Sequence, residues 1–578
     1  MTEPTTQRRH DLDALRAFAM LLGIGLHAAL SFAPFPWGVQ DVRQHELFTL
    51  FFLAVHGFRM QLFFLVSGFF TVMLWRRYGV KALLKHRFQR VFVPCLLGLM
   101  TIIPALHWVS NWAMASARQK QVSIDKSPPT SLVLAIRQRD SASIERLIAE
   151  GADLNAQDPE FGVRMLAWAA LLGDEDVARL LIEKGADLKG RNRDGSSALQ
   201  AATFLGNAAV VQLLLSHGAD PEARNDRGEQ PVDASRADWG TTQFLAGLLR
   251  VPLRPEAEVR AGQEECRKLL PASADRVATT TNQTENKLTS QLQQVRSVYA
   301  AMLSSERLRI RWSTTAEPFH LMLTSVFDHL WFLWFLCWLV PCFALFVTVA
   351  DRCGWKRPPN WLVLSPVRYC WLLPLTLLPQ LLMGTMSPSF GPDTSVGVFP
   401  QPHLLLYYGL FFAFGALYFD CDDSAGRLGR WWWLTIPVAL IVFLPASLAT
   451  MSSPALSGIL QVGYAWLMTF GMIGLFRRAL TREYAVIRYL SDASYWLYVA
   501  HLPLVIAGQH LIRDWPIPSG VKFMLLCSVV VGLLLVSYQT LVRYTWLGAM
   551  LNGRRQRPQI KCKSDSRNVG ETTIGACS

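Results

Sequence analysis

The sequence predicts an all-α membrane protein of about ten transmembrane helices, with a helical repeat solenoid inserted between the third and fourth helices. The chain has 578 residues, of which 51% are hydrophobic, with 20 Trp and 32 Phe. Apolar runs recur at about the 20-residue length that crosses a bilayer. One polar stretch, 111–318, interrupts them and holds an internal repeat.

The ten apolar runs define the expected helices. The run near 361–383 is the weakest, because Arg368 and three prolines interrupt it, so nine crossings is the alternative count. The runs lie near 14–33, 48–74, 91–109, 321–349, 361–383, 403–419, 431–449, 456–476, 493–511 and 521–541.

The charge of the loops favours ten crossings. The segment RRYGVKALLKHRFQR carries six Lys or Arg, and RCGWKR, FRRALTREYAVIR and the tail RRQRPQIKCK are also basic, whereas the alternate loops hold almost none. The positive-inside rule then predicts that both termini are cytoplasmic and that the insert is exported. The net charge of +13 is therefore a topology signal and not a nucleic-acid footprint. The first run contains Arg16 and lacks a small-residue cleavage site, so we expect it to remain as a helix.

The insert contains a repeat with a period of 33 to 34 residues. Its copies RLIAEGADLNAQD, RLLIEKGADLKGRNRDG and QLLLSHGADPEARNDRG place Gly151, Gly185 and Gly218 at equivalent positions. The period and the Gly that ends each second helix resemble the ankyrin repeat, so we expect about three such repeats in 131–235. The stack either binds a protein partner or acts as a spacer. A helical linker is expected over 236–318.

The ten cysteines indicate no metal or disulfide chemistry. Several lie in apolar runs, where Cys behaves as a small hydrophobe. Cys266 alone falls in the insert, which excludes an intrachain disulfide framework there. Because no spaced Cys and His set is present, we expect no metal site.

Ionisable residues inside apolar runs are the candidate functional residues, because charge at membrane depth is costly. Arg16 and His27 are eleven residues apart, which at about 100° per residue places both on one helix face. His56 and Arg59 are three apart and also share a face. A histidine bonded only to a neighbouring helix is the alternative interpretation of His27.

Other candidates lie at helix ends. Arg87 and Arg90 are one turn apart and suited to phosphate oxygens, and the alternative is that their charge only sets the membrane topology. Asp13 lies one turn before Arg16 and either pairs with it or serves the helix N-terminus. His329 and His501 are weaker candidates for the same cavity. No GxSxG motif surrounds Ser67, so Ser67 and Gly68 are predicted to allow close helix packing and Ser67 is not expected to be a nucleophile.

Several motifs together resemble membrane acyltransferase family 3. They are LDALRAFAMLLGIGLH, HGFRMQLFFLVSGFF, RFQR before VFVP, DHLWFLWFL and SDASYWLYVAHLPLV, in this order. The resemblance covers 1–110 and 319–545, and it is closest to a branch that succinylates periplasmic glucans. The repeat insert departs from the family pattern, and 546–578 is expected to be a basic, disordered tail.

The resemblance implies an O-acyltransferase of the bacterial inner membrane. It implies that a succinyl or acetyl group moves from acyl-CoA, a substrate and not a bound cofactor, to a carbohydrate hydroxyl. His27 and Arg16 would be the catalytic residues. Acyl-CoA would bind to Arg87 and Arg90. The substrate cavity would hold the other candidates: His56, Arg59, His329, His501 and Asp13. The expected partners are the carbohydrate, acyl-CoA, membrane lipid and a protein bound to the repeats.

Two other classes of function remain open. A transporter with a His and Arg relay would predict an inverted repeat, and the two halves show no internal similarity. A membrane-anchored scaffold, with the repeats as the working part, would leave the intramembrane His and Arg residues without a role.

Overall fold

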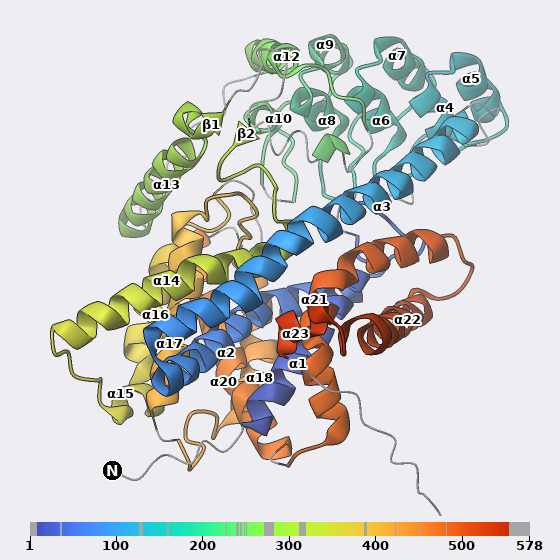
Figure 1. The fold of residues 1–578 in the computed structure, drawn as a ribbon. Coiled ribbons are helices and arrows are strands. Elements are labelled where there is room, and N and C mark those ends of the chain that lie inside the picture. Colours follow the sequence, from blue (N-terminus) through green and yellow to red (C-terminus); the bar gives the residue numbers. More distant parts are fainter. Residues whose placement is uncertain are drawn as a thin grey trace, which may run out of the picture.

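The computed structural model is almost entirely helical, as the sequence predicts (Figure 1). It describes residues 9–553 except 35–36, 126–130, 159–160, 227, 238–241, 243–244, 248, 250, 271–282, 311–318, 386–389, 422, 452 and 481. Within these residues the only sheet pairs β1 (Arg309–Ile310) with β2 (Phe319–His320), antiparallel. The predicted tail at 546–578 begins with helix α23 (Trp546–Asn552), and its residues 554–578 lie outside the described residues.

Each of the ten predicted apolar runs forms helix. The bundle consists of α1 (His10–Ala29), α2 (Glu46–Arg87), α3 (Val93–Asp125), α14 (Trp331–Arg352), α15 (Asn360–Leu364) with α16 (Arg368–Gln380), α17 (Pro402–Asp420), α18 (Trp432–Val438) with α19 (Leu444–Ala449), α20 (Pro454–Ala479), α21 (Ala485–Ile512) and α22 (Ser519–Ser537).

By length and composition, seven helical stretches in the described chain could cross a membrane. The number is below ten partly because α2 and α3 form one continuous stretch, bent where Gly79 adopts a positive φ of 78°. In addition, α16 has only 13 residues, and prolines lie within it. Proline removes a helical hydrogen bond, which explains why this run is short and broken.

The contacts between helices give their relative directions. Arg16 of α1 contacts Ser491 of α21, and further along both helices the His27 ring lies 5.2 Å from the His501 ring. Therefore α1 and α21 run parallel. This is the relation expected if the ten runs all cross, whereas nine crossings would make these two helices antiparallel.

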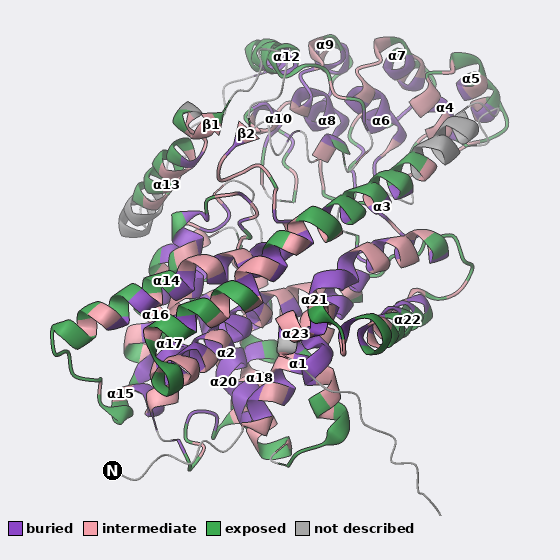
Figure 2. Cartoon of the chain, in the orientation of Figure 1, coloured by how far each residue is buried: buried purple, intermediate pink, exposed green. Residues whose placement is uncertain are grey.

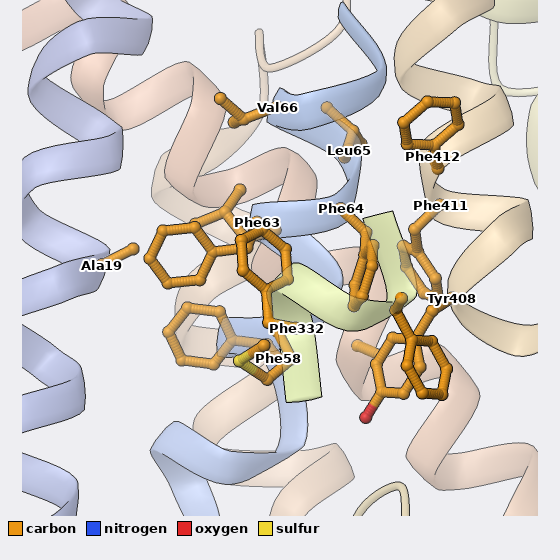
Figure 3. Packing of buried hydrophobic residues seen from close by; sticks show 14 of the residues in the cluster. Ala19, Phe58, Phe63, Phe64, Leu65, Val66, Phe332, Tyr408, Phe411 and Phe412 are labelled. Carbon is orange, nitrogen blue, oxygen red and sulfur yellow. The ribbon is translucent and has the colours of Figure 1, made fainter. Parts of the chain in front are cut away.

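Aromatic side chains form the core of the bundle. Phe64 lies at its centre, fully buried, with its ring 4.9 Å from Phe332 of α14 and 4.7 Å from Tyr408 of α17 (Figure 3). Helices α18 and α22 expose apolar side chains, including Trp433 and Val536, and Figure 2 shows the exposed face of α22. An apolar exterior around a packed interior is the arrangement of a protein that has lipid as its solvent.

The insert folds as a stack of helix pairs with its own core. It contains α4 (Leu132–Gln138), α5 (Ser141–Ala149), α6 (Met165–Leu172), α7 (Glu175–Glu183), α8 (Ala198–Phe204), α9 (Ala208–Ser216) and α10 (Pro231–Ala234). Trp168 is fully buried in this core. At equivalent positions Gly151, Gly185 and Gly218 adopt φ near 90°, which explains the repeated glycine.

The packed stack continues beyond the predicted boundary at residue 235. Helix α12 (Glu256–Leu269) packs on α9, and Gln263 donates to the carbonyl of Phe204 at 2.8 Å. Gly262 and Gly206 meet backbone to backbone. Part of the segment expected to be a linker therefore caps the stack, as terminal repeats must do.

Two long helices join the stack to the bundle. Helix α3 continues well past the predicted end of its run at 109, and its 33 residues span about 50 Å at 1.5 Å per residue. Helix α13 (Gln283–Leu303) returns to the bundle, where Arg296 donates to the carbonyl of Leu381 at 2.7 Å. The stack lies at the end of the bundle where α3 emerges, opposite the basic segment that precedes α3 (Figure 1).

Candidate active site

One face of α1 carries both leading candidates, as their spacing predicts. Arg16 donates to the hydroxyl of Ser491 at 2.8 Å and to its carbonyl at 3.2 Å. His27 packs against His501, ten residues further along α21. The eleven residues between Arg16 and His27 separate them by about 16 Å along the helix axis. The candidate residues therefore form two groups at the two ends of one helix interface, and Asp13, expected among the cavity residues, lies at the Arg16 end.

Three histidines from three segments meet at the His27 end. The ring of His501 lies 5.2 Å from that of His27 and 5.5 Å from that of His329, which precedes α14. His329 and His501 are buried. The fold thus brings together residues that are hundreds of positions apart in the sequence.

The backbone fixes the proton position on two of these rings. His329 contacts the carbonyl of Val499 through Nε2 at 2.9 Å, and His501 contacts the carbonyl of Tyr498 through Nδ1 at 2.8 Å. Because a carbonyl only accepts, each of these nitrogens carries the proton, and the opposite nitrogen presents a lone pair. Among the described residues, these opposite atoms, Nδ1 of His329 and Nε2 of His501, have no hydrogen-bond partner, and neither does Nδ1 of His27.

Arg59 of α2 adds a positive charge to this group. A methyl group placed on Gly23 would lie 2.1 Å from its Nη1, so the guanidinium rests on α1 one turn before His27. It is within electrostatic range of His27, His56 and His501. Among the described residues it has no hydrogen-bond or ion-pair partner, and its Nε is buried.

His56 faces a loop that covers this end of the bundle. Its ring stacks on Phe52 at 5.2 Å and contacts the carbonyl of Pro392 through Nε2 at 3.1 Å. Gly391 adopts a φ of 87° and leaves no room for a methyl group, which would lie 2.6 Å from the imidazole. His56 is thereby held at the edge of the histidine group.

The sequence pattern did not indicate Gln509 or Trp37, which support His27. Gln509 is fully buried, donates to the carbonyls of His27 and Ala28 at 2.9 and 3.2 Å, and accepts from Trp37 Nε1 at 2.9 Å. The Trp37 ring lies 6.2 Å from that of His27. No sequence signal indicated this role, because Gln509 donates to backbone carbonyls of α1, which no side-chain pattern reveals.

The second group, at the other end of the interface, is basic. Arg87 donates to the hydroxyl of Thr71 at 2.9 Å and is within electrostatic range of Arg16 and Arg90. Asp13 lies 3.5 Å from Arg16 and is its partner, as the spacing allows. Arg90 lies in a π-helical turn and approaches Gly553 at the end of the described chain. Three neighbouring cations with one adjacent carboxylate form a site suited to anions.

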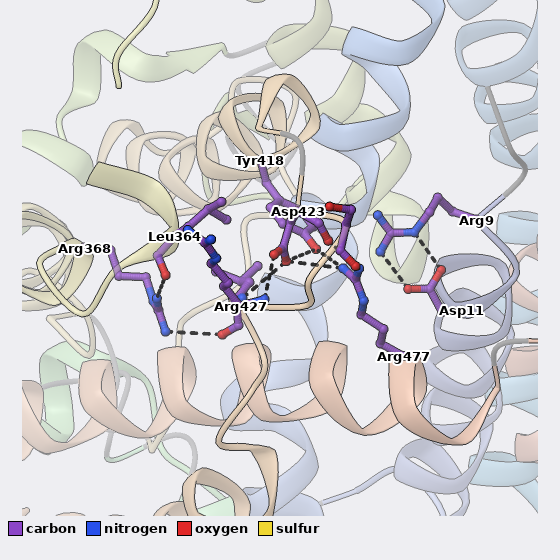
Figure 4. Close-up of polar contacts among 10 residues, drawn as sticks. Arg9, Asp11, Leu364, Arg368, Tyr418, Asp423, Arg427 and Arg477 are labelled. Carbon is purple, nitrogen blue, oxygen red and sulfur yellow. Dashed lines mark hydrogen bonds and ion pairs between the residues drawn. The ribbon is translucent and has the colours of Figure 1, made fainter. Parts of the chain in front are cut away.

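A separate ionic network lies at this same end. The Asp423 carboxylate accepts from the Tyr418 hydroxyl at 3.1 Å and from Arg477 at 3.3 Å, while Arg9 pairs with Asp11 at 2.7 Å (Figure 4). The Asp423 contacts join the end of α17 to α20, and Arg9 lies 6.0 Å from the Tyr418 ring centre, which brings the beginning of α1 to the same network. Each of these charges has a partner of opposite sign, so the network has a structural explanation without a ligand.

No group of three His, Cys, Asp or Glu side chains in the described part of the chain is arranged to hold a metal ion.

The fold and the two groups define a class: a helical membrane protein with a buried histidine and arginine site at one end of a helix interface and an anion site at the other. Comparison with known families gives the identity. The acyltransferase domain model matches residues 9–122 and 284–541, and the chain belongs to this family. The match includes α13, although this helix lies within 236–318, the segment predicted to be a linker. A model of three ankyrin repeats matches 132–225.

Known relatives resemble only part of the chain. The glucans biosynthesis protein C of Escherichia coli K12 is 41% identical over 106 residues, which is 18% of this chain and 26% of the relative. The protein of the same description from Escherichia coli O1:K1 gives the same figures. The chain thus matches about a quarter of the length of these relatives. The crystal structure of the ankyrin repeat domain of Bcl-3 is 27% identical, covering 21% of this chain and 50% of that one, with a TM-score of 0.18.

Proposed function

We propose that this membrane acyltransferase moves a short acyl group, succinyl or acetyl, from acyl-CoA to a hydroxyl of a periplasmic or cell-surface glucan. The observation that carries the proposal is the pairing of two sites on one interface. At one end, His27, His329 and His501 each have a buried ring nitrogen without a hydrogen-bond partner among the described residues, and Arg59 is within electrostatic range of His27 and His501. Arg16 and Arg87 lie at the other end.

The basic group suits the donor. Arg87 and Arg90 bind the phosphates of acyl-CoA, because guanidinium matches phosphate oxygens in bidentate geometry. Arg16 sits at the start of the α1 and α21 interface, so it guides the pantetheine arm toward His27. The separation of about 16 Å along α1 is taken up by this arm.

The histidine group suits the chemistry. In acyl transfer from a thioester, the acceptor hydroxyl attacks the carbonyl carbon, its proton goes to a base, and the thiolate of CoA leaves. His27 acts as that base, because a neutral imidazole has one ring nitrogen with a free lone pair that can take the hydroxyl proton. Arg59 stabilises the negative charge that develops on the carbonyl oxygen. His329 and His501 accept hydrogen bonds from the acceptor sugar.

The proposed orientation follows from the basic loops. With both termini in the cytoplasm of a bacterial cell, the basic group faces cytoplasmic acyl-CoA. The histidine group and the repeats then face the periplasm, where the glucan arrives. The ankyrin repeats bind a protein partner there.

The test is mass spectrometry of envelope glucans from a deletion strain. The strain is complemented with the intact chain, with His27→Ala, or with His107→Ala as a matched control at an exposed histidine whose ring pairs with Asp328. We expect acyl substituents with the intact chain and the control and none with His27→Ala. The mass of the substituent identifies the acyl group.

Other outcomes would contradict the proposal. Equal acylation with His27→Ala would remove His27 as the catalytic base. If deletion and complementation gave identical glucans, the glucan acceptor would be wrong, and transport or scaffolding would gain support.

A further inference from the structure

One cavity lies away from both the histidine group and the basic group. It has a volume of about 350 Å³ and opens between the beginnings of α16 and α18 and the middle of α20. Its lining includes Arg368, Tyr369, Trp431, Trp432, Leu467 and Phe470. No step of the proposed acyl transfer uses these residues.

Arg368 brings a buried charge to this cavity. Its side chain is only 6% exposed, and carbonyls hold the guanidinium in place: Nη1 donates to Leu364 and Ser365, and Nη2 donates to Leu428 at 3.2 Å (Figure 4). Within the described residues it has no carboxylate partner, and its Nε is buried without an acceptor. The three carbonyls reduce the cost of burying the guanidinium but do not neutralise its charge, so the site can still accept an anion.

The remaining walls of the cavity are apolar. The guanidinium lies 4.8 Å from the Phe470 ring centre and 4.9 Å from that of Tyr369. At the rim, Trp431 is 51% exposed and Leu434 is 46% exposed. On a membrane helix, exposed tryptophan is typical of the interfacial region of the bilayer, and exposed leucine is typical of the hydrocarbon region. The cavity therefore opens toward lipid.

We propose that this cavity binds an anionic phospholipid from the leaflet at the basic end of the bundle. Its phosphate lies at Arg368, and its acyl chain lies along Leu434 and Leu467. A membrane-facing cavity with one uncompensated cation and aromatic walls complements a headgroup phosphate joined to an apolar chain. A soluble phosphate compound matches the charge but leaves the apolar walls unfilled.

Native mass spectrometry of the purified full-length protein tests the proposal. Phosphatidylglycerol is titrated into wild type, Arg368→Gln, Leu467→Trp and a control, Arg352→Gln, at an exposed arginine at the end of α14. Leu467→Trp fills the cavity and leaves Arg368 unchanged. We expect one tightly retained phosphatidylglycerol on wild type and control, and at least about tenfold weaker retention on the other two variants.

Parallel titrations distinguish the sources of phosphate. Phosphatidylcholine, acetyl-CoA and inorganic phosphate should bind to this cavity at least about tenfold more weakly than phosphatidylglycerol. The proposal is wrong if phosphatidylcholine is retained equally, or if acetyl-CoA instead of lipid depends on Arg368. It is also wrong if Leu467→Trp retains the lipid as wild type does, a result that decides the question even if Arg368→Gln does not fold.

Discussion

Arg59 shows at the scale of a single residue what is unusual about the histidine end of the α1 and α21 interface. Arg76 and Arg477 pair with carboxylates, and Lys522 forms a fully buried ion pair with Asp41 at 2.8 Å. Arg59 has no such partner in the described chain, although it lies among histidines inside a helix of the bundle. An unpaired internal charge costs stability, so we propose that a ligand or reaction intermediate compensates the charge of Arg59.

Replacing Arg59 with Gln should therefore separate stability from activity. We expect acyl transfer to fall by about 10²- to 10³-fold, the effect of removing one donor to a developing oxyanion. Thermal stability should stay equal or rise, because an uncompensated charge is removed. Transfer assays and thermal unfolding on the same preparation measure both quantities.

Arg76→Gln is the matched control for Arg59→Gln. It breaks the ion pair between Arg76 and Asp420 and should leave transfer unchanged. Normal transfer by Arg59→Gln, or a stability loss larger than that of Arg76→Gln, would show that Arg59 has only a structural role.

The residues of the site were predictable to the extent that they are unusual within an apolar run. Ionisable side chains are rare in apolar runs, and this marked four residues as candidates: Arg16, His27, His56 and Arg59. The eleven-residue spacing of Arg16 and His27 placed these two on one helix face. Gln509 escaped prediction because its role depends on two backbone carbonyls of α1. The separation into two groups also required the structure, since helix pairing is not encoded in local periodicity.

At the scale of elements, α2 and α17 make the closest crossing in the core. A methyl group on Gly68 would lie 1.9 Å from the carbonyl oxygen of Phe412, and one on Gly415 would lie 1.9 Å from that of Leu65. The two glycines therefore allow backbone contact in both directions, as small residues do between membrane helices. The expectation that Gly68 serves packing agrees with this geometry.

Gly68→Ala should destabilise the bundle by about 1–3 kcal/mol, because neither backbone can yield without moving a helix. The matched control is Gly532→Ala on α22, where an added methyl group meets nothing within 4 Å. Thermal unfolding of both variants in the same detergent measures the difference. Equal melting temperatures would contradict the close crossing.

The apolar runs predicted where helices form better than where they end. Helix α3 continues past residue 109 into polar sequence, because a helix outside the membrane needs no apolar residues. Helix α12 lacks the repeat pattern yet packs on α9, so only tertiary contact assigns it to the stack. The break at Gly79 depends on a positive φ, which a helical pattern does not indicate.

At the scale of the whole molecule, the repeat stack is a unit with its own core, carried beyond the bundle by α3. Cys266 reports on this unit because it is fully buried in the stack core. Burial raises the pKa of its thiol to about 11. Since the thiolate is the reactive form, the folded stack protects this residue at neutral pH.

Maleimide labelling at pH 7 should therefore leave Cys266 unmodified in the folded protein. Exposed Cys353 should be labelled under the same conditions. After the stack is unfolded with urea, Cys266 should react at a rate similar to that of Cys353. Peptide mass spectrometry locates the label, and rapid labelling of Cys266 without urea would contradict the packing of α12 on the stack.

The central claim is that acyl groups pass from one end of the α1 and α21 interface to the other. The most direct measurement is single-turnover transfer in sealed proteoliposomes that hold radiolabelled acyl-CoA inside and glucan outside, using protein oriented with its basic end inward. We predict labelled glucan outside with wild type and His107→Ala, and none with His27→Ala. Equal labelling by His27→Ala, or labelling only when glucan and acyl-CoA share one compartment, would contradict the account.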